Sequence, residues 1–206
     1  MKHPPGSIRP IRLSRRPEPF DSEEYLYELK IDGFRALAHV SDGKGELVSR
    51  NGKVFRGFAE LATWIAEHLK IKNAVLDGEI ACIDGEGRPV FRELLFRQSP
   101  CIYVAFDLLY LNGKDLRTLP LIERKRQLRK ILGRRRTRIL YLDHVENDGK
   151  LLFEQIVKMD LEGMVCKRKS SPYRATEKPS PHWIKVKNPR YSQLERRDEL
   201  FEMSGR

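Results

Sequence analysis

Short strand-like segments, interrupted by a few helices, make up most of the patterned sequence and limit the folds open to it. Apolar and β-branched runs occur at 25–31, 34–40, 46–50, 74–83, 101–110, 139–145, 163–169 and 182–187. Apolar residues at helical spacing predict helices at 58–69, near 91–98, at 119–132 and at 150–160. Because these elements do not alternate as regular βαβ units, the sequence predicts an α+β fold with largely antiparallel sheets flanked by helices.

Length and composition favour one good-sized domain, alone or with an appendage. The 206 residues are 40% hydrophobic, which supports a sizeable core. No apolar run approaches the ~18 residues of a membrane span, and the first twenty residues lack the apolar centre of a secretory signal. Cys82, Cys101 and Cys166 lie far apart without CxxC spacing, and no HExxH motif occurs. We therefore expect reduced cysteines, a cytoplasmic location and no zinc site.

The basic residues are concentrated in three stretches. The formal net charge is +11; residues 1–20 carry five basic and one acidic side chain, residues 121–140 nine and one, and residues 163–190 eight and one. Such stretches suit a polyanion, so we favour nucleic acid as the partner over a merely basic, solvated surface. In the helix at 119–132, we expect the leucines to face inward and the basic residues to face outward, toward solvent or phosphate.

The stretch YELKIDGFRALAHV, residues 27–40, places charged residues inside an otherwise core-like run. Strand alternation puts Leu26, Glu28 and Lys30 on one face, which we expect to line a pocket, while the intervening residues join the core. Gly33 follows where a side chain would obstruct a ligand. From this stretch alone, an ion pair of Lys30 with Glu28 or Asp32 on an exposed face stays an open alternative.

Further stretches strengthen the pocket interpretation. SRNGK at 49–53 ends a strand with an arginine, LDGEIACI at 76–83 puts Asp77 and Glu79 on one strand face, and VAFDLLYLNG at 104–113 carries Phe106. LEGMVCKR at 161–168 and WIKVK at 183–187 supply an acid and several lysines. Alternation points Lys185 and Lys187 the same way, as a phosphate ligand would require.

These motifs together resemble those of the covalent nucleotidyltransferases, which comprise ATP-dependent DNA ligases, RNA ligases and mRNA capping enzymes. KIDGFR matches the KxDGxR lysine motif, and SRNG, LDGEI, AFDLLYLNG, LEGMVCK and WIKVK look like the later motifs in the family's order. Six ordered motifs are specific where KxDG alone would be weak. The chain is most similar to bacterial ATP-dependent DNA ligases, including the ligase module of end-joining proteins.

The resemblance implies an ATP-grasp-like nucleotidyltransferase fold and a role for each matching residue. Lys30 would be the nucleophile that takes AMP as a phosphoramidate. The expected ligand contacts are Glu28 on the adenine amino group, Phe106 stacked on adenine, Arg35 and Arg50 on the ribose or phosphate, Glu79 and Glu162 on the ribose and a divalent metal, and Lys167, Lys185 and Lys187 on the phosphates. Two further residues, Asp107 and Cys166, are expected to be structural.

Elementary acid–base chemistry is consistent with this role for Lys30. A free lysine has a pKa near ~10.4, so about one in a thousand is neutral at physiological pH. Burial and neighbouring cations such as Lys185, Lys187 and Arg35 lower the pKa and expose the amine. Uncompensated carboxylates would raise it, so a Mg²⁺ ion that neutralises them is part of the expectation.

The resemblance divides the chain into a basic extended segment at 1–21, an adenylation domain at 22–190 and a polar tail at 191–206. The family continues after WIKVK into an OB-fold domain, which we do not expect here. Residues 195–202, ERRDELFE, faintly resemble the family's final motif through Arg197 and Asp198 but lie too close to WIKVK. With only 29 residues before Lys30, ATP is favoured over NAD⁺.

The implied function is that of an ATP- and Mg²⁺-dependent DNA ligase, or its adenylation domain, acting on nicked double-stranded DNA. An OB-fold or repair partner would act in trans. Two alternatives stay open: the same chemistry on RNA, in an RNA ligase or capping-type enzyme, and a module that binds nicks without turnover.

Overall fold

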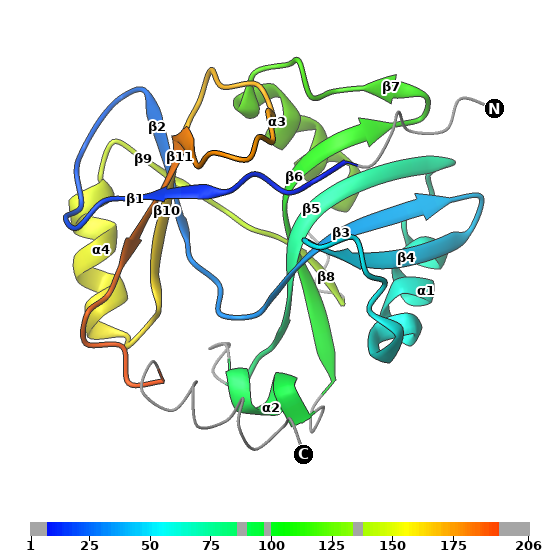
Figure 1. The fold of residues 1–206 in the computed structure, drawn as a ribbon, viewed down its shortest axis with the longest axis horizontal. Helices are drawn as coiled ribbons and strands as arrows, with labels where there is room; N and C mark the ends of the chain where they lie inside the picture. The colour runs from blue at the N-terminus through cyan, green and yellow to red at the C-terminus, as the bar shows by residue number, and fades with distance from the viewer. Residues whose placement is uncertain (1–7, 86–89, 97–99, 134–137, 194–206) are drawn as a thin grey trace.

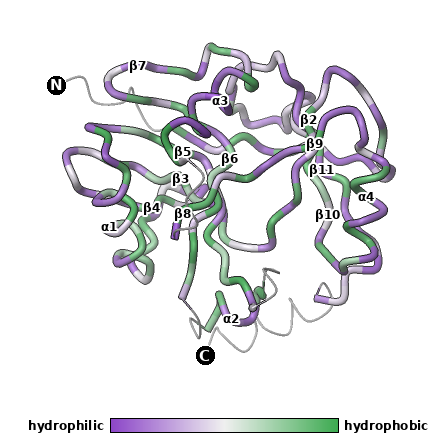
Figure 2. Tube along the Cα trace, turned by 180° about the vertical axis from the view of Figure 1, so that it is seen from behind, coloured by the Kyte–Doolittle hydropathy of each residue, from purple (hydrophilic) through white to green (hydrophobic). Residues whose placement is uncertain are grey.

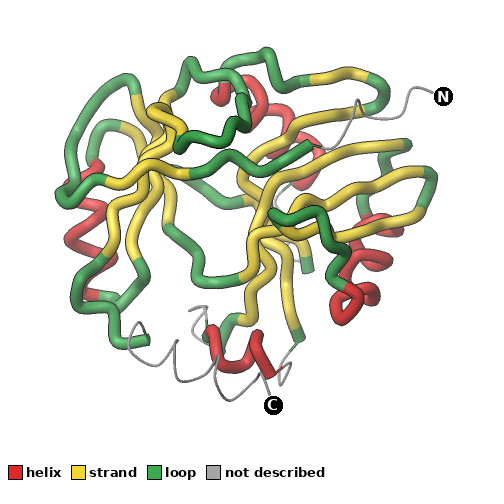
Figure 3. Tube along the Cα trace, in the orientation of Figure 1, coloured by secondary structure: helices red, strands yellow, loops and turns green. Residues whose placement is uncertain are grey.

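Two β-sheets lie beside each other with helices on their outer sides (Figures 1 and 3). The computed structural model describes residues 8–85, 90–96, 100–133 and 138–193. The first sheet has the order β1-β11-β10-β2-β9, and the second has the order β4-β3-β5-β6-β7 with β8 also paired to β6. All strand pairs are antiparallel except β1–β11 and β6–β8. The predicted α+β fold with largely antiparallel sheets and flanking helices is confirmed.

The strand bounds lie close to the predicted ones. The first sheet consists of β1 (Leu13–Arg15), β11 (Ser180–Lys187), β10 (Gly163–Arg168), β2 (Tyr25–Leu29) and β9 (Val145–Glu146). The second consists of β4 (Lys44–Ser49), β3 (Phe34–Ser41), β5 (Asn73–Cys82), β6 (Cys101–Leu111), β7 (Lys114–Asp115) and β8 (Ile139–Tyr141). The strand expected at 139–145 is thus two short strands in different sheets.

The described residues form five helical segments that cover the sheets: η1 (Arg56–Phe58), α1 (Ala59–His68), α2 (Phe91–Phe96), α3 (Leu121–Leu132) and α4 (Gly149–Lys158). Helix α1 packs on β4, α2 on β5, α3 on β6 and α4 on β10. Figure 2 shows hydrophobic and hydrophilic stretches alternating along α1 and α4, as one buried helix face requires. No helix in the described ranges is long and apolar enough to cross a membrane.

Strand β2 is buried on both faces, which corrects part of its predicted pattern. Tyr27 packs under α4 with Ile156 and Val186, whereas Leu26 packs between the two sheets with Phe106 and other apolar side chains. Leu26 therefore belongs to the core and does not line a pocket. Only the later part of the same strand face, from Glu28 onward, opens into a cavity.

The basic helix α3 also differs from its expected orientation. Leu121 and Leu128 are buried as predicted, and Leu132 packs against the core. Arg124 and Lys125 are also buried, with 0% and 1% of their surface exposed. They occupy positions i+3 and i+4 from Leu121, so helical geometry places them on the same inward stripe. The expectation that all the basic residues face outward is wrong for these two.

The extended segment before β2 is built into the first sheet. Strand β1 runs parallel to β11, and Ile11 is buried between the sheets. Residues 10–13 also line the cavity described below. The arginines at 134–136 and the acidic and basic residues at 195–202 lie outside the described residues.

Candidate active site

A cavity of about 300 Å³ is lined by residues of both sheets and of the segment around β1. The connection from β2 to β3 crosses between the sheets and carries Lys30 into this cavity (Figure 1). Eight of the ten residues predicted from sequence line it: Glu28, Lys30, Arg35, Arg50, Glu79, Phe106, Lys167 and Lys185. The tertiary structure thus brings together residues spread over more than 150 positions.

Glu162, one of the other two predicted residues, pairs with Lys30, and the second, Lys187, lies next to Glu162. The Lys30 Nζ is 2.5 Å from Glu162 Oε2, and the Lys187 Nζ is 4.0 Å from Glu162 Oε1. The Lys30 backbone N–H also donates to the Gly163 carbonyl at 2.8 Å. The alternative ion pair of Lys30 with Glu28 or Asp32 is therefore replaced by a pair with an acid 132 positions away.

Two glycines beside Lys30 are required by close backbone approaches. A Cβ on Gly33 would lie 2.2 Å from the Ile80 carbonyl oxygen and 2.7 Å from Glu79 Cγ. Gly163 has φ +147°, and a Cβ there would lie 2.3 Å from the Val186 carbonyl oxygen. The absence of a side chain at Gly33 therefore lets the chain approach β5. The sequence predicts that Gly33 clears space for a ligand, but the close approach to β5 explains its position.

Glu79 faces Lys30 from β5. Burial raises the pKa of Glu79 to about 8, with further upward contributions from the carboxylates of Glu162 and Asp77, and Arg35 and Lys30 offset part of that increase. The carboxyl group is thus protonated at neutral pH. A cation that binds between Glu79 and Glu162 would favour its ionised form.

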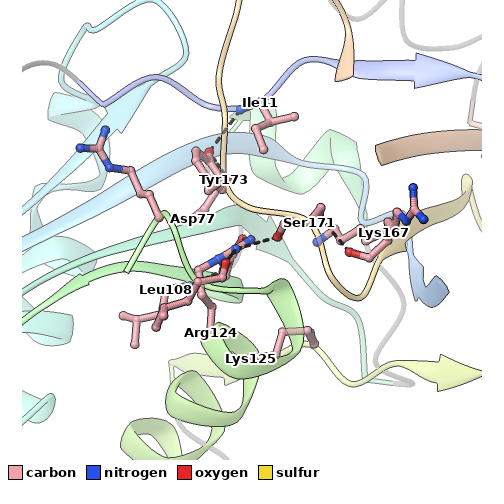
Figure 4. A network of polar contacts seen from close by, with 12 residues as sticks. Ile11, Asp77, Leu108, Arg124, Lys125, Lys167, Ser171 and Tyr173 are labelled. Carbon is pink, nitrogen blue, oxygen red and sulfur yellow. Dashed lines mark hydrogen bonds and ion pairs between the residues drawn. The ribbon is translucent and has the colours of Figure 1, made fainter. Parts of the chain in front are cut away.

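Arg35 is oriented by an aspartate that the sequence did not single out for a role. Its Nε and Nη2 donate to the two Asp77 carboxylate oxygens, each at 2.7 Å. Tyr173 Oη donates to Asp77 Oδ2 at 2.6 Å, in the polar network of Figure 4. The guanidinium carbon lies 4.8 Å from the Phe106 ring centre. This bidentate pair fixes the guanidinium at the cavity wall.

Glu28 is held between two lysines deep in the cavity wall. Lys125 Nζ lies 2.5 Å from its Oε1, and Lys167 Nζ lies 2.5 Å from its Oε2. Burial alone would raise the pKa of Glu28, but the two ammonium groups lower it below the usual value. Burial, together with Lys125, lowers the pKa of Lys167 to about 8 against the opposing effect of Glu28. The two ammonium groups therefore keep the Glu28 carboxylate ionised.

Lys167 lies against the aromatic wall of the cavity. Its Nζ is 4.0 Å from the Phe106 ring centre and 4.1 Å from that of Trp183. Lys167 is thus the charge partner of Glu28, next to the aromatic wall. Lys185 lines the cavity nearer to Lys30, and burial together with Lys187 and Lys30 lowers its pKa.

Arg50 is exposed just after β4 and lines the mouth of the cavity. It also borders a second hollow of about 390 Å³ that Arg9 and Arg12 line. The two residues expected to be structural lie elsewhere. Asp107 is fully buried in a bidentate pair with Arg124 at 2.8 Å, and Cys166 packs in the core under α4.

The carboxylates of Glu79 and Glu162 suit a magnesium ion whose remaining ligands come from substrate phosphates and water. No cluster of three or more histidine, cysteine or acidic side chains with metal-site geometry occurs within the described ranges. Glu79 and Glu162 would supply two oxygen ligands next to Lys30. Mg²⁺ is commonly held by one or two carboxylates plus substrate phosphates and water, so this set fits.

Comparison with protein families identifies the chain. Residues 15–187 match the family described as the ATP dependent DNA ligase domain. The chain belongs to this family. The match begins at the end of β1 and ends at the end of β11, so it spans both sheets and all ten predicted site residues.

Curated relatives of the ligase domain include longer proteins. The multifunctional non-homologous end joining protein LigD of Pseudomonas aeruginosa is 35% identical over 170 residues, which cover 80% of this chain and 20% of that protein. The SPbeta prophage-derived DNA ligase-like protein LigB of Bacillus subtilis is 31% identical, over 91% of this chain and 70% of that protein. The chain thus spans about a fifth of the first relative and most of the second.

Solved structures of ligase domains share the fold. The ligase domain of LigD from M. tuberculosis has a TM-score of 0.78 and 27% identity, over 87% of this chain and 59% of that one. A mycobacterial DNA ligase D complexed with ATP and MES also has a TM-score of 0.78, with 25% identity over 88% of this chain and 60% of that one. The adenylation-domain fold predicted for a bacterial-type ligase is confirmed.

Proposed function

We propose that this ligase domain uses ATP to form a covalent lysyl-AMP at Lys30 and transfers the AMP to the 5′-phosphate at a nick in double-stranded DNA. The observation that carries the proposal is the placement of Lys30 between Glu162, Lys187 and the cavity lined by Glu28, Arg35 and Phe106. In the first step, the Lys30 amine attacks the α-phosphorus. A P–N bond forms, the bond to pyrophosphate breaks, and the attacking nitrogen loses a proton.

The nucleotide would lie with its base toward Glu28 and Phe106 and its phosphates toward Lys30. The Glu28 carboxylate accepts hydrogen bonds only, so it suits the amino group of adenine. Phe106 offers a ring at the same wall. Arg35 and Arg50 are placed for the ribose or the phosphate, and Lys185 and Lys187 for the phosphates, where positive charge offsets the transferring phosphoryl group.

Lys30 attacks as an amine, and in the structure its side chain is held by Glu162 at 2.5 Å. Mg²⁺ at Glu79 and Glu162 would neutralise negative charge on the carboxylates and the phosphates. Glu162 would then hold the Lys30 side chain less strongly, and Lys185 and Lys187 would offset further phosphate charge. Glu162 thus holds Lys30 in place, and a bound cation would weaken that hold.

DNA is the substrate class that the family and the basic surface support. Relatives of the chain are named as DNA ligases or DNA ligase-like proteins, and the net charge is +11. Contacts of lysine and arginine with phosphates release counterions, so binding should weaken steeply with salt. We also propose a cytoplasmic location, and an OB-fold or repair partner that acts in trans on the nick.

The deciding experiment is intact-mass measurement of the protein after incubation with ATP and Mg²⁺. We expect a gain of one AMP, removed by pyrophosphate, and transfer of labelled AMP to nicked DNA. Preferential labelling by GTP would indicate capping-type chemistry, and transfer to nicked RNA alone would indicate an RNA ligase. Binding to nicked DNA with no label on Lys30 would leave a nick-binding module and overturn the proposal.

A further inference from the structure

Lys125 contacts two cavity-lining groups from behind without lining the cavity itself. Its Nζ is 2.5 Å from Glu28 Oε1 and donates to the Leu142 carbonyl at 3.0 Å. Both Glu28 and Leu142 line the cavity. The ammonium also lies 4.6 Å from the Tyr141 ring centre. Figure 4 shows Lys125 on α3 next to Arg124, which is bonded to Ser171. Helix α3 therefore supplies a charged anchor to the wall that we assign to the base.

Stability alone does not explain a buried lysine at this position. The side chains of Lys125 and Glu28 are each 1% exposed, and taking both charges out of water costs several kcal/mol per ion. A buried ion pair is often no more stabilising than apolar residues of the same size. A pair does, however, fix a carboxylate in one orientation and keep it ionised.

We propose that Lys125 is a positioning residue for nucleobase selection, because it holds the Glu28 carboxylate so that the cavity accepts adenine and rejects guanine. This inference rests on the proposed lysyl-AMP chemistry. An ionised carboxylate accepts from the exocyclic amine of adenine, whereas the exocyclic oxygen of guanine is itself an acceptor and would repel it. The Glu28 carboxylate discriminates between the two bases only if it is held in one orientation and cannot rotate away from the guanine oxygen.

Lys125 and Lys167 both pair with Glu28, but only Lys167 lines the cavity. Lys167 holds the second carboxylate oxygen and lies at the cavity, against Phe106 and Trp183. Lys167 is therefore next to the position that we assign to the base. Lys125 lies behind the wall, so its contact with Oε1 persists while the base binds.

The test compares ATP with GTP in the labelling of Lys30 by wild type, Lys125→Met and Lys125→Gln. Methionine has a similar length without charge, and glutamine keeps an N–H donor without charge. Lys130→Met is the matched control, since Lys130 is an exposed lysine on the same helix. The ATP-to-GTP ratio of kcat/KM is independent of the fraction of active protein, so a loss of stability cannot change it.

We expect Lys125→Met to lower that ratio at least about tenfold, mainly by raising the KM for ATP, since lost discrimination at a hydrogen-bonding site is typically large. Lys125→Gln should lower it less, and Lys130→Met should leave it unchanged. An unchanged ratio in folded Lys125→Met overturns the inference while leaving the lysyl-AMP proposal intact. If neither Lys125 variant folds, the residue is a fold determinant and the inference is also overturned. A wild type that forms no lysyl-AMP instead overturns the function on which both depend.

Discussion

Two clusters of the same chemistry, each one glutamate and two lysines, differ in burial. In the buried cluster, Glu28 holds Lys125 and Lys167, whose side chains are 1% and 2% exposed. In the open cluster, Glu162 faces Lys30 and Lys187, whose side chains are 20% and 34% exposed.

The difference in exposure separates a fixed wall from a reactive group. Both glutamates are almost fully buried, so the lysines account for the contrast. A lysine sealed against its partner cannot exchange protons or move toward a substrate without leaving a buried charge unpaired. A lysine that keeps one side toward a cavity can give up its proton to solvent and attack a ligand. Composition alone would not distinguish the two clusters.

The largest expected effect is on chemistry in the open cluster. Lys30→Met should abolish covalent labelling by ATP, because the amine that we propose as the nucleophile is lost. Lys30→Arg should be equally inactive, since a guanidinium stays protonated. Intact mass and autoradiography measure the label, and circular dichroism should show an unchanged fold. Normal labelling of either variant would show that another group carries the nucleotide.

The next effect is on stability in the buried cluster. Glu28→Gln should destabilise the fold by about 3–5 kcal/mol, because two buried ammonium groups lose their shared counter-charge. Urea unfolding, compared at equal m-value, measures this loss. Lys30→Met serves as the reference, since it removes a charge from the open cluster. Equal stability losses for the two variants would mean that burial does not separate the clusters.

A smaller effect is expected when the acid of the open cluster is neutralised. Glu162→Gln should slow labelling on the order of 100-fold at fixed Mg²⁺ and raise the Mg²⁺ concentration needed for half-maximal rate, because one charged oxygen ligand is lost. The measurement is a Mg²⁺ titration of single-turnover labelling. Glu79→Gln should shift the same titration in the same direction. Unchanged titrations for both variants would identify these acids as structural.

The smallest effect concerns pH and the protonated acid beside Lys30. The pKa of Glu79 is raised from 4.5 to about 8 in the folded protein, mainly by burial. Between these values the unfolded chain ionises while the folded protein does not, so the wild type loses stability as the pH rises from about 4.5 to about 8. Glu79→Gln cannot ionise and avoids this loss.

The quantity compared is the melting temperature of Glu79→Gln minus that of wild type. At pH 5 this difference should lie within about a degree of the pH-independent effect of the substitution, and at pH 9 it should be several degrees higher. Differential scanning fluorimetry at both pH values measures the change in the difference. Other ionisable groups are common to both proteins and cancel. A difference that does not grow with pH would show that Glu79 is ionised across the range.

Much of the fold followed from local patterns. The strands around Lys30, on β5, on β6 and at WIKVK lie close to the predicted bounds because period-two apolar patterns are local properties. The ordered motifs also selected ten candidate site residues that the fold gathers in one region. Eight of them line one cavity, Glu162 pairs with Lys30, and Lys187 lies next to Glu162.

The ion-pair partners of the charged residues were harder to predict than the strands and helices that carry them. Lys30 pairs with Glu162, not with its neighbours in sequence. Asp77 on β5 accepts hydrogen bonds from Arg35 on the adjacent strand β3. Lys125 was expected to face outward, toward solvent or phosphate, because it is charged, although its spacing from Leu121 and Leu128 matches the inward stripe of α3. That spacing was the available signal. It was outweighed by the usual rule that lysine is exposed.

The sequence by itself determined the class of fold and the family, and it supplied the residues that we propose as nucleophile and nucleotide contacts, because these depend on short-range periodicity and on motifs read along the chain. Only the tertiary structure decided which charges meet and how deeply each is buried. Glu28 and Glu162 each lie between two lysines, yet the packing of α3 against β6 seals one cluster while the crossing between the sheets leaves the other open. Burial sets the cost of moving a charge, and burial is a property of the assembled sheets and helices.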